Sequence, residues 1–498
     1  MKRTILILIA LCTGLLEVGA ERAFIPPRIC PQPKECEIVK TEWVTLSSVS
    51  IACGEAEGVE WAKRHLKAWY GKQAPRIMAA SRNTSDLGKE AYALRTTDDG
   101  VEVDASTLQG LRYALYSLRQ LAVAAPGTKT VSGWMVPKCV IRDEPRMAFR
   151  GMHICWFHET EPWEVERLIR LAAYYKLNYA VIESWGSFRS KVAPWYGWPD
   201  GTMTHREVRR LVKLANDLGI TLIPQINCFG HASMARGGAS KHAALDLAPQ
   251  YQSLFEPHNG WNWCLSNPET RKLLQALIAE QLEAFGNPPY FHIGCDEAEM
   301  PSCPACIKQP YSQLLLNHIE ALNTTIREHG ARAMMWHDML LERGDSRWQG
   351  FYANGTPETA TGFLKFPRDI IICDWYYGGA KEAYPTLDYF QQEGFQVLSC
   401  PWHNESGIMA QGQYASRAGL FGMLGTLWHH YFGWDMTRSY FYLSNMAWNA
   451  DGFMKQADKD QSYIATHLRQ MGWDMGTTNP RHTGIFYDEI PPEPQQND

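Results

Sequence analysis

Beyond its first twenty residues, the chain lacks any uninterrupted apolar run of the ~18 residues that a membrane-spanning helix needs. It also lacks a strong excess of charge: 48 basic and 53 acidic residues leave a formal net charge of −5. This balance excludes a basic nucleic-acid-binding chain, and a charged fraction of only 20% excludes disorder driven by charge. With 498 residues, 45% of them hydrophobic, the chain exceeds what one small core requires, and we expect two packed domains.

The first twenty residues form a separate unit. Two basic residues precede an apolar run from Ile5 to Leu16, and Val18-Gly19-Ala20 supplies the small residues that a signal peptidase reads. So short a run is typical of a secretory signal rather than of a spanning helix. We therefore predict a signal peptide over 1–20 and a secreted or periplasmic location. Lipid anchoring at Cys12 is disfavoured because Leu11, which precedes it, is bulky.

Cysteine is present without a complete metal-binding pattern. Thirteen cysteines allow disulfides in an exported chain, and Cys30 and Cys36, which flank a proline-rich segment, are the first predicted pair. Cys303-Pro-Ala-Cys306 is compatible with a redox pair, half of a zinc site, a small disulfide loop or two free thiols. A lone CxxC is a weak zinc signal because four ligands are required and no second pair has matching spacing.

Residues 21–143 are predicted to form a small α/β domain. Alternation over Trp43–Ile51 predicts a strand, and helical periodicity predicts helices over Glu57–Tyr70 and Leu108–Leu121. Two short strands flank Asp98-Asp99-Gly100, a hairpin signal. Acids, histidines and cysteines do not cluster in this part of the sequence, so we place no catalytic site there.

From residue 144 to 452, short apolar runs alternate with helical stretches eight times. This rhythm predicts a (β/α)₈ TIM barrel, so the fold class is α/β, with a barrel preceded by the small domain. Residues 453–498 are expected to form a partly disordered extension. The expected strands are 148–155, 179–184, 220–227, 289–295, 332–337, 369–375, 395–400 and 421–428. The expected helices are 163–176, 204–218, 267–285, 311–329, 357–365, 381–393, 411–419 and 437–451.

Polar and aromatic residues follow every expected barrel strand. Active sites of such barrels lie at the C-terminal ends of the strands. Tryptophan gathered at one rim favours a sugar pocket, where ring faces pack on C–H groups and polar tips hold hydroxyls. The strand ends carry, in order, Trp156 and His158; Glu183 and Trp185; Asn227 and His231; Asp296 and Glu297; Trp336, His337 and Asp338; Asp374 and Trp375; Trp402 and His403; and Trp428, His429 and His430.

The most specific motif is Phe291-His-Ile-Gly-Cys-Asp-Glu297. Adjacent residues on a regular strand face opposite ways, so Asp296 and Glu297 can serve one site only where the strand ends or bends. Gly294 gives the backbone that freedom. On composition alone, the alternative is a solvated acidic loop.

This motif resembles the catalytic signature of glycoside hydrolase family 20, the β-N-acetylhexosaminidases, whose usual form is His-x-Gly-Gly-Asp-Glu. Cys295 in place of the second Gly is similar to the branch that contains hexosaminidase D. The resemblance covers about 90–450, and its segments occur in the family's order. These segments are Phe149-Arg150-Gly151, Lys176-Leu177-Asn178, Gly219–Pro224 with Gly230-His231-Ala232, Met335–Asp338, and Leu427-Trp428.

The resemblance implies a retaining, substrate-assisted mechanism. Glu297 is then the general acid and base, with a pKa raised by the apolar walls and the neighbouring acid, and Asp296 polarises the substrate's 2-acetamido N–H. The acetamido oxygen attacks the anomeric carbon, giving an oxazolinium intermediate. No cofactor or metal is implied. The implied substrate-binding residues are Arg150 on O3 and O4, His231 behind the two acids, Trp336, Trp375 and Trp428 around the acetamido group, and Asp338, Glu183, His430 and Tyr376.

Some positions depart from the family pattern. Gln225 stands where Glu is common, and strand two reads Glu183-Ser-Trp-Gly186. The Tyr that would bind the acetamido oxygen is not evident; Tyr376 or Tyr377 are the candidates. His429 and His430 follow Trp428 where a Glu is expected, which affects the contacts to O4 and O6 most.

The sequence thus predicts an exported exo-β-N-acetylhexosaminidase acting on glycans with a terminal β-linked GlcNAc or GalNAc. No nucleic acid partner and no stable membrane insertion are expected. Three alternatives remain: a catalytically silent glycan-binding protein on the same barrel, an enzyme that prefers 6-sulfated GlcNAc, and a zinc hydrolase using His429, His430 and Cys303. The last lacks a helical His-x-x-x-His spacing.

Overall fold

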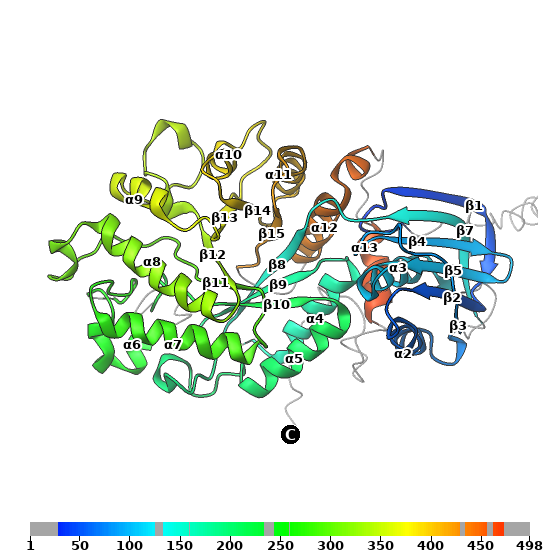
Figure 1. Ribbon diagram of the computed structural model, residues 1–498, viewed down its shortest axis with the longest axis horizontal. Helices are drawn as coiled ribbons and strands as arrows, with labels where there is room; N and C mark the ends of the chain where they lie inside the picture. The colour runs from blue at the N-terminus through cyan, green and yellow to red at the C-terminus, as the bar shows by residue number, and fades with distance from the viewer. Residues whose placement is uncertain are drawn as a thin grey trace, which may run out of the picture.

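The computed structural model describes residues 28–124, 133–158, 160–233, 244–257, 259–428, 434–455 and 462–472. A small α/β domain precedes a closed barrel, and the two lie side by side (Figure 1). The predicted fold class is confirmed. None of the described helices is both long and apolar enough to cross a membrane.

The small domain is built on a mixed sheet with the order β1-β7-β4-β5-β2-β3, in which β6 pairs with β7. Helices α2 (Gly58–Tyr70) and α3 (Leu108–Leu121) pack on the sheet; Thr107 caps α3 by accepting from the Gly110 N–H. The strands are β1 (Glu35–Thr45), β2 (Ser48–Cys53), β3 (Arg76–Ala79), β4 (Tyr92–Thr97), β5 (Gly100–Ala105), β6 (Val123–Ala124) and β7 (Trp134–Asp143), and η1 spans Gly71–Gln73.

One expected strand of this domain is wrong. Trp43–Ile51 is divided between β1 and β2, which do not pair with each other: β1 pairs with β7, and β2 lies between β3 and β5. The chain changes direction at Leu46 and Ser47, where buried Leu46 continues the apolar alternation through the turn. Alternation alone therefore does not reveal this break.

In the second part of the chain, eight described parallel strands close in the order β8-β9-β10-β11-β12-β13-β14-β15, with β15 pairing to β8. All eight overlap the strands expected from the sequence. They are β8 (Phe149–Trp156), β9 (Tyr179–Ser184), β10 (Thr221–Gln225), β11 (Tyr290–His292), β12 (Arg332–Trp336), β13 (Ile371–Trp375), β14 (Gln396–Cys400) and β15 (Gly422–Gly425).

The helices between these strands form the outer ring (Figure 1). The helix expected at 411–419 begins earlier, at Glu405, because Asn404 caps it by accepting from the Gly407 N–H at 3.0 Å. The α-helices are α4 (Pro162–Tyr174), α5 (His205–Leu218), α6 (Ala244–Leu247), α7 (Pro268–Ala284), α8 (Tyr311–Glu328), α9 (Pro357–Gly362), α10 (Pro385–Gln392), α11 (Glu405–Ala418), α12 (Trp434–Met454) and α13 (Ser462–Gly472). Short 3₁₀ turns are η2 (Pro194–Tyr196), η3 (Pro249–Leu254), η4 (Cys306–Lys308), η5 (Asp338–Leu340), η6 (Ser346–Trp348) and η7 (Phe363–Lys365).

Alternate residues of each barrel strand face the interior. Near the N-terminal ends of the strands, Phe149 stacks on Tyr179 with ring centroids 4.4 Å apart, so this end of the barrel is filled. The interior cluster also contains Trp336 and Trp375 at the opposite, C-terminal ends of their strands. Because inward and outward positions alternate, the register of each strand decides which of its last residues can reach the site.

The two parts meet through buried polar contacts. The Trp61 indole N–H on α2 donates to the Asp217 carbonyl on α5 at 2.7 Å. Asp143, at the end of β7, accepts from the Trp448 indole at 2.8 Å and from the Lys176 ammonium at 3.3 Å. Such contacts fix the small domain against the N-terminal side of the barrel.

The cysteines of the described residues are all free thiols, so the predicted Cys30–Cys36 disulfide is wrong. Cys30 lies instead in a polar niche made by α12, where its sulfur is 3.5 Å from the Ser444 hydroxyl and 3.2 Å from the Asn445 amide nitrogen. Cys36 lies on β1, opposite Ile141 of β7. The proline-rich segment therefore docks on the barrel's last long helix rather than closing on itself.

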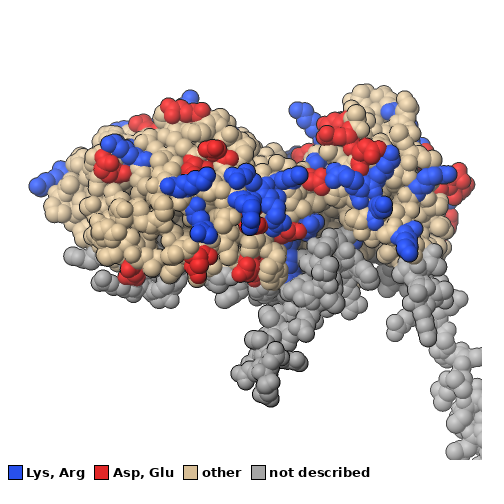
Figure 2. Space-filling model, turned by 90° about the horizontal axis from the view of Figure 1, so that it is seen from below, with Lys and Arg blue, Asp and Glu red and all other residues tan. Residues whose placement is uncertain are grey.

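The surface carries charges of both signs. Figure 2 shows Lys and Arg gathered near the middle of one face, with Asp and Glu among them. On α5, Arg210 is paired with Glu166 at 2.7 Å and with Glu207 at 2.8 Å. The basic side chains are thus partly neutralised by their neighbours.

Candidate active site

The loop after β11 brings two adjacent carboxylates to one side. Gly294 has φ 64°, Cys295 φ 78° and Glu297 φ 47°, so three of four consecutive residues lie in the left-handed region. A Cβ on Gly294 would lie 2.2 Å from the Asn227 side-chain oxygen, so this position requires glycine. The strand therefore ends in a sharp turn, which is the condition under which Asp296 and Glu297 can serve one site.

His231 joins the two acids. Its Nε2 lies 3.4 Å from Asp296 Oδ2 and 3.3 Å from Glu297 Oε2. Asp296 is buried, whereas the side chain of Glu297 is 49% exposed. Close packing fixes the arrangement, because a Cβ on Gly230 would lie 2.1 Å from the Asp296 carbonyl oxygen.

The charges of this triad are mutually dependent. Burial disfavours the imidazolium, but the two carboxylates outweigh burial and raise the pKa of His231 to about 10. The hydrogen bond from His231 in turn lowers the pKa of Glu297. The expected rise in the pKa of Glu297 is therefore wrong for this state of the protein, because the hydrogen bond from His231 outweighs the effect of burial.

Asp338 supports the loop from below. Its Oδ2 accepts the Glu297 backbone N–H and the Asn354 amide, both at 2.9 Å, and its Oδ1 accepts the Trp375 indole N–H at 3.3 Å. Burial, together with the charge of Asp296, raises the pKa of Asp338 to about 7. Asp338 is fully buried, so the structure gives it a positioning role in place of the expected direct contact with substrate.

The three predicted tryptophans form one wall. The rings of Trp336 and Trp428 lie 5.5 Å apart, and Trp375 lies 5.0 Å from Tyr377. The Trp428 indole N–H donates to the Tyr377 hydroxyl at 2.5 Å. Burial raises the pKa of Tyr377 well above 10, and the charge of Asp296 adds to the rise, so this wall stands close to the carboxylates.

Of the two candidate tyrosines, Tyr377 rather than Tyr376 lies against the tryptophan wall. Trp375 faces the barrel interior, so Tyr376 faces outward, where its ring lies 5.0 Å from Phe351 and 5.8 Å from Tyr384. Tyr377, one position further, faces inward again and joins the tryptophan wall. Both tyrosines lie just past the end of β13, and the alternation of that strand continues through them.

Arg150 is also placed wrongly by the sequence argument. It is fully buried at the start of β8, and its guanidinium bonds to Glu90 at 2.6 Å and to the Tyr113 hydroxyl at 2.8 Å. Its neighbour Phe149 faces the barrel interior, so Arg150 faces outward toward the small domain. It therefore lies at the end of the strand opposite the carboxylates and cannot hold O3 and O4 of a sugar bound there.

Glu183 lies beneath the site. Its Oε2 is 2.7 Å from His153 Nε2 and its Oε1 accepts the Asn227 amide at 2.7 Å. Burial would raise the pKa of Glu183, but these partners lower it. Both Glu183 oxygens are hydrogen-bonded and only 1% of the residue is exposed. Glu183 therefore supports the residues beneath the site, whereas the sequence predicted a direct contact with the sugar. His430 lies outside the described residues.

Three residues near the carboxylates were not predicted from the sequence. The Trp261 indole N–H donates to the Glu297 carbonyl at 2.7 Å, and its ring lies 4.3 Å from His231. The Tyr352 ring lies 4.0 Å from that of Trp375, tilted by 30°, and the Asn354 amide donates to Asp338. All three lie on loops well past the strand ends, where the sequence has no helical or strand periodicity to indicate their position. The presence of aromatic residues in these long loops was the only feature of the sequence that pointed to them.

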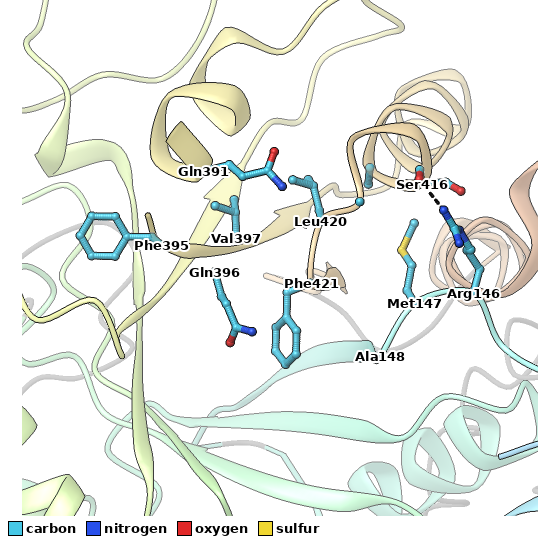
Figure 3. A pocket seen from close by; sticks show the side chains of 12 residues that line it. Arg146, Met147, Ala148, Gln391, Phe395, Gln396, Val397, Ser416, Leu420 and Phe421 are labelled. Carbon is cyan, nitrogen blue, oxygen red and sulfur yellow. Dashed lines mark hydrogen bonds between the residues drawn. The ribbon is translucent and has the colours of Figure 1, made fainter. Parts of the chain in front are cut away.

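A pocket of about 420 Å³ lies at the other end of the barrel (Figure 3). It is lined by Ala148, Gln396 and Phe421, at the N-terminal ends of β8, β14 and β15. Arg146, the one charged side chain among its described lining residues, donates to the Ser416 carbonyl at 3.5 Å. This pocket holds no acid–base pair, so the chemistry belongs to the loop after β11.

Two family models match the chain. The model of "Glycosyl hydrolase family 20, catalytic domain" matches residues 148–441, and that of "Glycosyl hydrolase family 20, domain 2" matches residues 26–144. The first match alone spans more than half of the chain and includes Asp296, Glu297 and His231.

Individual relatives are more distant. The chain is 26% identical over 303 residues to a beta-hexosaminidase of Porphyromonas gingivalis, which covers 52% of this chain and 37% of that protein. It is 27% identical over 382 residues to a beta-hexosaminidase of Vibrio furnissii, covering 70% of this chain and 59% of that protein. The chain thus spans well under two thirds of the length of these curated relatives.

Solved structures share the fold. The GH20 exo beta-N-acetylglucosaminidase of Vibrio harveyi, in complex with N-acetylglucosamine, superposes with a TM-score of 0.66 at 19% identity, covering 90% of this chain and 78% of that one. The GH20 beta-N-acetylhexosaminidase of Streptomyces coelicolor gives 0.64 at 16% identity, covering 94% and 99%.

Proposed function

The chain belongs to glycoside hydrolase family 20, and from this premise we propose that it is a retaining exo-β-N-acetylhexosaminidase that removes a terminal β-linked GlcNAc or GalNAc from glycans. The observation that carries the proposal is the contact of one histidine, His231, with two adjacent carboxylates of unequal exposure. Unequal exposure suits two different roles. The names of the matched relatives support the same activity.

Glu297 is the proton donor and acceptor in this proposal. Its half-exposed carboxyl can reach a glycosidic oxygen, give it a proton, and later take one from the attacking water. A sugar covering the carboxyl removes water from it, which raises its pKa toward the value that an acid needs. After the proton has left, the imidazolium of His231 stabilises the carboxylate that remains.

Asp296 holds the nucleophile. Its Oδ1 is buried and has no hydrogen-bond partner among the described residues, so it can accept the N–H of a 2-acetamido group. This bond turns the acetamido oxygen toward the anomeric carbon and stabilises the positive charge that develops on the oxazolinium ion. The wall of Trp336, Trp375, Trp428 and Tyr377 excludes water from that intermediate.

The test is hydrolysis of aryl β-GlcNAc, β-GalNAc and β-glucoside by the purified chain. We expect turnover of the first two and essentially none of the glucoside, which lacks the nucleophile. A thiazoline mimic of the oxazoline should inhibit strongly, because it resembles the intermediate. Binding of GlcNAc without hydrolysis would instead favour a catalytically silent glycan-binding protein.

Export belongs to the same proposal. It is supported by the basic start, the apolar run and the small residues of positions 1–20, which lie outside the described residues. N-terminal sequencing of the protein recovered outside the cytoplasm should begin after Ala20. Recovery of the chain with residues 1–20 intact inside the cell would contradict this part of the proposal.

A further inference from the structure

A second cluster of reactive side chains lies behind the catalytic loop. Cys264, Cys303, Cys306 and Glu256 each direct a ligand atom to one point, and these atoms all lie within 4.8 Å of one another. The first and last of these in the sequence, Glu256 and Cys306, come from different barrel loops: one follows β10 and the other follows β11. Cys303 and Cys306 form the CxxC motif whose role the sequence left open.

The sulfur distances are those of a metal–thiolate site. Cys264 Sγ lies 3.6 Å from Cys303 Sγ and 3.7 Å from Cys306 Sγ. A tetrahedral zinc ion with Zn–S bonds of about 2.3 Å holds its sulfurs about 3.8 Å apart. A disulfide would require about 2.05 Å, and a cluster of three thiols would leave one unpaired.

The fourth group is a buried carboxylate with a free oxygen. Glu256 is 5% exposed, and its Oε2 accepts the backbone N–H groups of Ser302 at 2.8 Å and Cys303 at 2.6 Å. Its Oε1 is buried and has no hydrogen-bond partner among the described residues. A buried carboxylate oxygen left without a partner is costly unless a cation occupies the adjacent position.

The backbone prepares the site as well. The Cys306 N–H donates to Cys303 Sγ at 3.2 Å, a bond that stabilises a thiolate over a thiol. Three thiolates and one carboxylate match the ligand types and the coordination number of a closed tetrahedral zinc site. We propose that Cys264, Cys303, Cys306 and Glu256 bind one structural Zn²⁺.

The ion would tie together the two loops that shape the active site. Two residues before Cys264, Asn262 donates to the Glu299 carbonyl at 2.7 Å and accepts from the Glu299 N–H at 3.1 Å. Trp261, one residue earlier, holds the Glu297 carbonyl. Zinc thus fastens the base of the loop that carries Glu297 to the loop that carries Trp261, and takes no part in the reaction itself.

The test measures metal directly on the full chain, purified under reducing conditions without chelator. We expect one zinc per chain by elemental mass spectrometry in the wild type and in the control Cys53→Ser, a half-buried thiol of the small domain. Cys264→Ser and Cys306→Ser should hold well below one equivalent. Glu256→Gln should retain zinc but lose it faster to a chelator.

A second measurement uses the wild type alone, in case the variants fail to fold. Cobalt added after removal of zinc should give the thiolate-to-metal absorption and the intense visible bands of a tetrahedral site. Hydrogen exchange at 259–264 and 299–306 should slow when zinc is restored, with the small domain unchanged. A wild type that takes up neither zinc nor cobalt, or peptide mapping that finds Cys303 bonded to Cys306, would overturn the proposal.

Discussion

At the residue scale, His231 sets the charge of the two carboxylates that it contacts. Its pKa is raised to about 10, so it is a cation throughout the neutral range, and it lowers the pKa of Glu297. Glu297 must be protonated to act as the acid. Because its pKa is low, it loses that proton at low pH, and kcat/KM should fall as pH rises through this pKa.

Replacing His231 by Gln removes the cation, so the pKa of Glu297 should rise. The limb of the pH profile on which kcat/KM falls should therefore move to higher pH, even though overall activity drops. The profile of kcat/KM against pH measures this, with His329→Gln, an exposed histidine after α8, as the control. An unmoved limb would mean that Glu297 is not the titrating acid.

The acid role of Glu297 is tested separately through the leaving group. Glu297→Gln should lower kcat by about 10²–10⁴ on a natural disaccharide, because the leaving oxygen needs a proton. The loss should shrink on an aryl glycoside with an acidic phenol. Glu299→Gln, an exposed neighbour, is the matched control. Equal losses on both substrates would contradict the assignment.

At the scale of elements, the two adjacent tyrosines that directly follow β13 pack on different sides. Tyr377→Phe removes the hydroxyl that accepts the Trp428 N–H, and one lost hydrogen bond should lower kcat/KM about 2–12-fold. Tyr376→Phe, which lies directly after β13 and packs away from the wall against Phe351, should leave it unchanged. If the two variants behave alike, the inward placement of Tyr377 has no bearing on catalysis.

Near the C-terminal end of β13, burial raises the pKa of Asp374 from 3.8 to about 8. The folded state therefore keeps a proton that the unfolded chain loses, and stability falls as pH rises from about 4 to about 8. Asp374→Asn mimics the protonated form and should escape this loss.

The melting temperatures of wild type and Asp374→Asn, measured from pH 4 to 9, should therefore diverge in favour of the variant as pH rises. Asp98→Asn, exposed in the hairpin turn between β4 and β5, should follow the wild type. Parallel curves for wild type and Asp374→Asn would contradict a neutral Asp374.

At the whole-molecule scale, the order of elements was predictable because eight strands and their helices repeat a strong periodic signal. The Asp296-Glu297 pair could be singled out for a related reason, because two adjacent acids directly follow a buried strand. Arg150 and Tyr376 were misplaced because a motif names a residue, while strand register decides which face it occupies. Trp261 and the partners of Cys303 were missed because long loops bring them together without any local pattern.

The contact between the small domain and the barrel supplies another whole-molecule prediction. Glu90→Gln removes the anion that pairs with buried Arg150. Breaking a buried pair costs about 3–5 kcal/mol, and less here because Glu90 is 30% exposed. The melting temperature should fall by several degrees, while KM for aryl β-GlcNAc stays at the wild-type value. A large rise in KM would contradict this structural role and would indicate that Arg150 contacts the sugar.

In the mechanism we propose, Asp296 positions the substrate's own acetamido oxygen to attack the anomeric carbon while Glu297 protonates the leaving oxygen. The most direct test is kcat/KM of the wild type on aryl β-GlcNAc carrying zero, one, two or three fluorines on the acetyl methyl. Each fluorine withdraws electrons from that oxygen, so we predict a steep, graded fall in kcat/KM across the series. A rate that is independent of fluorination would contradict substrate-assisted catalysis.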